Sequence, residues 1–111
     1  MNKLRVGIAG MGVLGTRRKE RIDRHPALHV VAVCDRGYDG EGVRADGVRY
    51  YENYRRLLSE NLDVLFVCLT NDVAAEVTIA GLEAGLHVFC EKPPGCSVEE
   101  VVRVIAHERT H

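Results

Sequence analysis

Residues 3–15, KLRVGIAGMGVLG, decide the fold of this chain. In their first half, apolar side chains alternate at Leu4, Val6 and Ile8, which predicts a short β-strand. The second half, GMGVLG, spells G-x-G-x-x-G, and residues 16–24 continue without Gly or Pro, as a helix does. A strand, a glycine turn and a helix in this order indicate dinucleotide binding.

Each glycine of the motif has its own physical task. Gly10 permits a sharp turn, because only glycine takes positive φ without steric cost. Gly12 lets the backbone approach a pyrophosphate, and Gly15 lets the helix pack closely on the strand. The first N–H groups of the helix, near Val13 and Leu14, would then face the phosphates.

A second strand supports this interpretation. Residues 28–34, LHVVAVC, are almost wholly apolar and end at Asp35, which lies 20 residues after Gly15. The motif expects an acidic residue at this distance, where it binds the adenosine ribose hydroxyls. The alternative is a glycine turn in another α/β domain, with Asp35 as an ordinary polar strand end.

The composition bounds the class of protein. A chain of 111 residues with 46% hydrophobic and 28% charged residues predicts one globular domain. The net charge of −1 gives no general attraction to nucleic acid or to an anionic membrane. We see no signal-peptide profile and no apolar run of membrane-spanning length, and we expect a cytoplasmic protein.

The spacing of the cysteines does not indicate a zinc site, since no two of them form a C-x-x-C pair. Cys34, Cys68 and Cys90 lie in or at the end of apolar strands, and we expect them to be reduced, buried thiols. Cys96 falls in a loop and is expected to be the most exposed.

Strands and helices alternate along the chain. The expected strands are residues 3–9, 28–34, 48–51, 63–69 and 87–90. This alternation predicts an α/β fold with a doubly wound parallel sheet (Rossmann), five strands in the order 3-2-1-4-5. The ligand crevice then lies at the carboxyl ends of the first and fourth strands, where the winding reverses.

The connections carry their own signals. Four glycines among charges make residues 36–47 a loop or a frayed short helix. Asn53 can cap a short helix through residues 57–59 that stops at Asn61. A further helix runs to about residue 84 and stops at Gly85, and a capping box of Ser97 with Glu100 begins the last helix.

One stretch carries a more specific resemblance. Residues 80–93, AGLEAGLHVFCEKP, with the glycine motif and the VAVCD strand end, resemble the Gfo/Idh/MocA (glucose-fructose oxidoreductase-like) family of NAD(P)-dependent dehydrogenases. The resemblance implies that residues 1–111 are the NAD(P)-binding domain, and that the C-terminal substrate domain is not in this chain. It implies hydride transfer between nicotinamide and a secondary alcohol of a sugar, nucleotide-sugar or cyclitol.

The resemblance also implies roles for single residues. Lys92 would be the catalytic lysine that hydrogen-bonds the reacting oxygen of a small-molecule substrate, and Glu91 would lie near the nicotinamide ribose. The family usually has a histidine where this chain has Ala74, which puts any role of that histidine in doubt. The other implied cofactor contacts are Gly10, Gly12, Val13, Leu14, Gly15, Asp35, Arg36, Leu69, Thr70 and Asn71.

The cofactor choice turns on two neighbouring side chains. Arg36 could meet the 2′-phosphate of NADP, whereas Asp35 repels that phosphate. We expect NAD as the cofactor and favour it over NADP.

Three functions remain open from the sequence. The first is the cofactor-binding part of a longer oxidoreductase, with the isolated chain inactive because catalysis needs a positioned substrate. The second is a stand-alone, non-catalytic NAD-binding module, which would have no use for Lys92. The third is another two-domain reductase with the same first strand and turn. A chain that ends before a sixth strand should expose apolar surface, so we expect a homo-oligomer.

Overall fold

The computed structural model describes residues 3–69, 73–90, 102 and 105–106. The elements, in chain order, are β1 (Leu4–Ala9), α1 (Val13–Asp23), β2 (Leu28–Cys34), β3 (Gly42–Val43), β4 (Arg49–Tyr51), α2 (Tyr54–Leu57), β5 (Val64–Val67), α3 (Val73–Glu83) and β6 (His87–Cys90).

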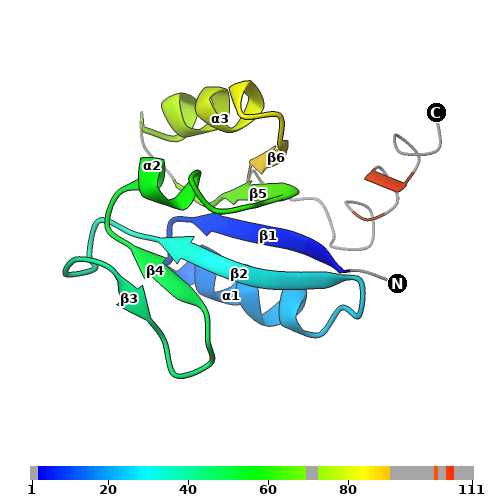
Figure 1. Cartoon of the computed structure of the whole chain (residues 1–111), viewed down its shortest axis with the longest axis horizontal. Coiled ribbons are helices and arrows are strands. Elements are labelled where there is room, and N and C mark those ends of the chain that lie inside the picture. Colours follow the sequence, from blue (N-terminus) through cyan, green and yellow to red (C-terminus); the bar gives the residue numbers. More distant parts are fainter. Residues whose placement is uncertain (1–2, 70–72, 91–101, 103–104, 107–111) are drawn as a thin grey trace.

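The strands form one sheet in the order β3-β4-β2-β1-β5-β6, shown in Figure 1. All neighbours are parallel except β3 and β4. The expected order 3-2-1-4-5 corresponds to β4-β2-β1-β5-β6, and it is confirmed. Ala9 pairs with both Cys34 and Val67, and Cys34 pairs with Tyr51, so these four strands end level with one another.

The expectation of a loop or a frayed short helix over residues 36–47 is wrong in part, because this segment contains the edge strand β3. Gly42 pairs with Tyr50, and Val43 pairs with Arg49 in antiparallel register. A Cβ on Gly42 would lie 2.7 Å from the Tyr50 hydroxyl, so glycine leaves the space that this ring occupies. Two residues are too few to show an alternating pattern, which is why the sequence did not indicate a strand.

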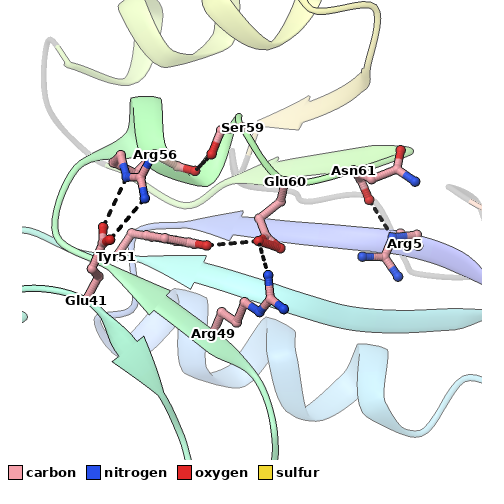
Figure 2. A network of polar contacts seen from close by, with 8 residues as sticks. All are labelled: Arg5, Glu41, Arg49, Tyr51, Arg56, Ser59, Glu60 and Asn61. Carbon is pink, nitrogen blue, oxygen red and sulfur yellow. Dashed lines mark hydrogen bonds and ion pairs between the residues drawn. The ribbon is translucent and has the colours of Figure 1, made fainter.

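The short helix after β4 begins as expected and ends early. The Asn53 side chain accepts a hydrogen bond from the Arg55 N–H at 2.8 Å, which confirms the N-cap. α2 ends at Leu57, before the expected stop at Asn61. The carbonyl of Asn61 instead accepts a hydrogen bond from Arg5 (Figure 2), which ties this loop to β1.

Helices cover both faces of the sheet, as a doubly wound fold requires (Figure 1). On one face Ile22 of α1 packs into an apolar cluster with Val6, Ile8 and Val30. On the other face, Leu57 of α2 and Val77 of α3 pack against a second cluster. Both faces of the central strands are therefore buried, which explains their near-continuous apolar sequence.

The cysteines divide into two groups. Cys34 and Cys68 are buried, as expected, but Cys90 is exposed, so its expected burial is wrong. Cys90 is the last residue of β6, at the end of the described sheet, and its sulfur lies 3.2 Å from the Thr78 hydroxyl. Cys96 and the capping box of Ser97 lie outside the described residues.

The described helices are short relative to the thickness of a lipid bilayer. Among the residues that the structure describes, no helix combines the length and the apolar character needed to cross one.

Candidate functional site

The glycine turn begins at Gly10, directly after β1. Its φ is +96°, in the region that favours glycine, and its N–H donates to the carbonyl of Cys34 at 2.8 Å. A Cβ here would lie 2.7 Å from the carbonyl oxygen of Cys68. The turn is therefore held between β2 and the end of β5, and it accepts no other residue without movement.

The other two glycines meet opposite surroundings. A Cβ on the buried Gly15 would lie 1.8 Å from the carbonyl oxygen of Gly10, so α1 rests directly on the turn. A Cβ on Gly12 would meet no atom within 4 Å, and its φ of −72° is open to any residue. Gly15 is thus needed for packing, whereas Gly12 leaves open space in front of the helix.

The N-terminus of α1 is prepared for an anion. Gly12 is its N-cap and makes no side-chain hydrogen bond to the first turn, and that turn holds no acidic residue. The N–H groups of a first turn have no partner inside the helix, and the helix dipole favours negative charge there. Val13 and Leu14 are exposed, and this end of α1 can therefore receive a phosphate.

Asp35 is fixed beside the glycine turn. One carboxylate oxygen accepts the N–H of Met11 at 2.7 Å, and the other accepts the N–H of Gly37 at 2.7 Å. The Asp35 N–H donates to the carbonyl of Tyr51 at 3.1 Å. A carboxylate has about four acceptor positions, so each oxygen keeps capacity for a ligand hydroxyl.

A cavity of about 890 Å³ opens at this edge of the sheet, on the face covered by α2 and α3. The sequence-predicted residues that line it are Gly10, Asp35, Arg36 and Leu69. The position agrees with the expected crevice at the ends of β1 and β5. Its remaining lining residues are Cys34, Gly40, Glu41, Glu52, Asn53, Tyr54, Arg56, Val73 and Val77.

Other predicted site residues lie elsewhere. Gly12, Val13 and Leu14 form the exposed start of α1 and do not line the cavity, and Gly15 is buried behind them. Four residues, including the proposed catalytic lysine, lie outside the described residues: Thr70, Asn71, Glu91 and Lys92.

The sequence interpretation missed the wall that α2 and the segment before β3 supply. Tyr54, Arg56, Glu41 and Glu52 belong to it, and Asn53 was predicted only as a helix cap. A signal was present, because polar residues follow the strand at residues 48–51, and its carboxyl end meets the same sheet edge.

An ion pair closes part of that wall. Arg56 donates to both carboxylate oxygens of Glu41, from Nη2 at 3.0 Å and from Nε at 3.2 Å, as Figure 2 shows. The Arg56 guanidinium also lies 5.8 Å from the centroid of the Tyr51 ring. The hydrogen bonds from Arg56 lower the pKa of Glu41 and keep it ionised at neutral pH.

The cavity lining also includes the buried thiol of Cys34. Burial raises the pKa of Cys34 to about 12, partly opposed by a hydrogen bond from the Gly10 backbone. Within the described part of the chain, no group of three or more His, Cys, Asp or Glu residues is placed to hold a metal ion. The described part of the site therefore offers an uncapped helix start and a fixed carboxylate to a ligand, without a cluster of metal-ligating side chains.

Comparison with known proteins gives this geometry a family. Residues 4–111 match the oxidoreductase family Gfo/Idh/MocA, described by its NAD-binding Rossmann fold. The chain belongs to the Gfo/Idh/MocA family. Its match covers nearly the whole chain, so the family's NAD-binding domain is what these residues form.

Proteins similar to this chain include dehydrogenases and a reductase. Inositol 2-dehydrogenase of Salmonella typhimurium is 31% identical over 112 residues, covering 96% of this chain and 33% of the relative. The WlbA dehydrogenase of Bordetella pertussis, in complex with NADH and UDP-GlcNAcA, superposes with a TM-score of 0.71 at 26% identity, over 83% of this chain and 29% of its own. Biliverdin reductase of Synechocystis, with biliverdin and NADP+, gives 0.66 at 25% identity, over 81% and 29%.

The chain spans about a third of the length of the curated relatives it matches. Within that third, the described residues fit the nucleotide that the family binds. The uncapped helix start and the open space at Gly12 have the chemistry to receive a phosphate, and the fixed carboxylate of Asp35 has the chemistry to accept hydroxyl groups.

Proposed function

We propose that this domain binds NAD in the crevice between the glycine turn and α2, and serves an oxidoreductase that transfers a hydride between nicotinamide and a secondary alcohol of a sugar, nucleotide-sugar or cyclitol. One observation carries the proposal. The carboxylate of Asp35 is bound to the glycine turn through Met11 N–H at 2.7 Å and lines the same cavity as Gly10. A ribose acceptor and a phosphate-binding helix start are thus fixed to one another.

The described residues divide the nucleotide among them. The start of α1 at Gly12, Val13 and Leu14 would bind the pyrophosphate through backbone N–H groups. Asp35 would accept hydrogen bonds from the hydroxyls of the adenosine ribose. The apolar side chains of Val73 and Val77 in the cavity lining suit the face of the adenine ring, and the exposed Arg36 would cover it.

NAD is the cofactor that the charges at Asp35 favour. A 2′-phosphate on the ribose would approach a carboxylate that is already held in place by two backbone N–H groups. The negative charges of the phosphate and the Asp35 carboxylate would repel each other, whereas two ribose hydroxyls can donate hydrogen bonds to the same carboxylate oxygens.

The reaction is inferred from the relatives and from the sequence after β6. The relatives include dehydrogenases named for inositol, and one structure holds a nucleotide-sugar acid beside NADH. A bound nicotinamide would supply the carbon that accepts or donates the hydride. We propose that Lys92 hydrogen-bonds the reacting oxygen, where a cation stabilises negative charge developing on it. We further propose that Leu69, Thr70, Asn71 and Glu91 bind on the nicotinamide side.

The role of Lys92 can be tested by substituting it in the full-length enzyme that carries this domain. We expect Lys92→Ala to lower kcat by roughly 10²–10³-fold, the usual cost of removing a donor that stabilises developing negative charge. The dissociation constant for NAD should stay within about twofold, because the nucleotide is bound by other residues. Steady-state kinetics with myo-inositol and related polyols, together with calorimetric titration of NAD, gives both quantities.

The exposed Lys3→Ala variant is the matched control, since it removes the same charge far along the chain. It should leave both quantities unchanged. Wild-type turnover in Lys92→Ala would contradict the catalytic assignment of this residue. Binding of NAD by the wild-type protein without turnover of any polyol would favour a non-catalytic NAD-binding module.

A further inference from the structure

We propose that Glu41 selects against a 2′-phosphorylated nucleotide by occupying the guanidinium of Arg56. This inference rests on the proposed function, because it concerns the same nucleotide in the same crevice. It goes further by assigning the cofactor preference to an ion pair in the wall as well as to Asp35.

The ion pair lies at the cavity and joins two separate segments. Glu41 precedes β3 and Arg56 belongs to α2, and their side chains point toward each other in Figure 2. Both line the cavity that Asp35 and Arg36 line. Arg56 uses both Nη2 and Nε on the two oxygens of Glu41, at 3.0 and 3.2 Å. This is the bidentate geometry in which arginine binds either a carboxylate or a phosphate.

Tyr51 connects this pair to the ribose end of the site. Its carbonyl accepts the Asp35 N–H at 3.1 Å, and its ring lies 5.8 Å from the Arg56 guanidinium. The Arg56 guanidinium therefore lies over the ring of Tyr51, whose backbone carbonyl is hydrogen-bonded to Asp35. A 2′-phosphate on the ribose that Asp35 would bind lies in the cavity whose lining also contains Arg56.

The remaining charges of the wall favour a neutral ribose. Asp35, Glu41 and Glu52 oppose Arg36 and Arg56 in the cavity lining. Glu52 is engaged by the Gly40 N–H at 3.2 Å. The carboxylate of Glu41 already accepts the hydrogen bonds of Arg56 Nε and Nη2 and balances its positive charge. A phosphate would therefore be attracted only weakly to Arg56. The structural relatives include one with NADH and one with NADP+, so the choice falls to the side chains of each chain.

The pair is not needed to hold the fold. The Arg56 side chain is 59% exposed and that of Glu41 is 47% exposed, and exposed ion pairs add little to stability. A change of Glu41 can thus alter nucleotide selection in a folded protein.

The test measures binding of ADP-ribose and of 2′-phospho-ADP-ribose, which differ only in the phosphate. In Glu41→Gln we expect the phosphorylated probe to bind about tenfold more tightly, because one repulsive charge is lost and Arg56 is released. ADP-ribose should change by less than about twofold. Glu83→Gln removes the same charge from an exposed position on α3 outside the cavity, and it should change neither probe.

The double variant Glu41→Gln with Arg56→Gln decides whether Arg56 carries the effect. We expect the gain for the phosphorylated probe to disappear in it. A gain that persists without Arg56, or no gain in Glu41→Gln while wild type binds ADP-ribose, would overturn the inference alone. Failure of wild type to bind either probe would overturn the proposed function and this inference with it.

Discussion

At the scale of single residues, Asp35 has two tasks that one variant would disturb together. Its oxygens accept the N–H groups of Met11 and Gly37, and they are also the proposed acceptors for ribose hydroxyls. Asp35→Asn keeps an oxygen for one backbone donor, whereas Asp35→Ala removes both acceptors. The pair of variants separates the local structure from the nucleotide contact.

We expect Asp35→Ala to weaken NAD by roughly 10- to 100-fold, the loss of one hydrogen bond to a charged group. NADP should weaken less, because the variant also removes a charge that repels its 2′-phosphate. Calorimetric titrations of both nucleotides measure the two losses. Asp39→Ala, an exposed aspartate on the same segment, is the control, and equal losses for NAD and NADP would remove Asp35 from the ribose site.

Residues of the site were predictable where local sequence determines them. Gly10 and Asp35 stand at fixed distances within one strand-helix-strand unit, so spacing sufficed. Glu41 and Arg56 are 15 residues apart, and they meet only because α2 packs over the sheet. No pattern of the sequence encodes that meeting.

At the scale of elements, the turn and α1 form one unit in which two glycines serve different ends. We expect Gly15→Ala to lower the free energy of unfolding by about 3 kcal/mol, because the new Cβ would meet the rigid carbonyl of Gly10. Gly12→Ala should cost no more than about 1 kcal/mol, since its Cβ meets nothing. Urea unfolding of both variants measures these energies.

Binding should rank the two variants differently from stability. In Gly12→Ala the methyl group would enter the space in front of α1 where we place the pyrophosphate, so NAD should bind at least about tenfold more weakly. Full affinity in a folded Gly12→Ala variant would show that no phosphate approaches this turn.

The elements themselves were predictable when apolar pattern and end signals agreed. β6 and the Asn53 cap of α2 match their expected places. β3 was missed because its two residues gain their order from pairing with β4, not from their own sequence. Cys90 was misjudged because burial at a strand end depends on what lies beside the strand.

At the scale of the whole molecule, the level carboxyl ends of β4, β2, β1 and β5 bring the site together. Ala9, Cys34, Val67 and Tyr51 are register partners, so the segments that follow them meet at one edge. The strand order was predictable because alternation and right-handed crossovers leave few orders, and the glycine motif is typical of the Rossmann one. The cavity wall depends on how α2 and α3 lie over the sheet, and it was not.

The most direct test of nucleotide binding at this edge is a titration of the ¹⁵N-labelled chain with NAD, followed by NMR of the backbone amides. We predict saturable shifts at Gly12, Val13, Leu14, Asp35 and Arg36, with little change in the second half of α1. Absence of saturable shifts, or shifts confined to residues away from the glycine turn and Asp35, would contradict the account.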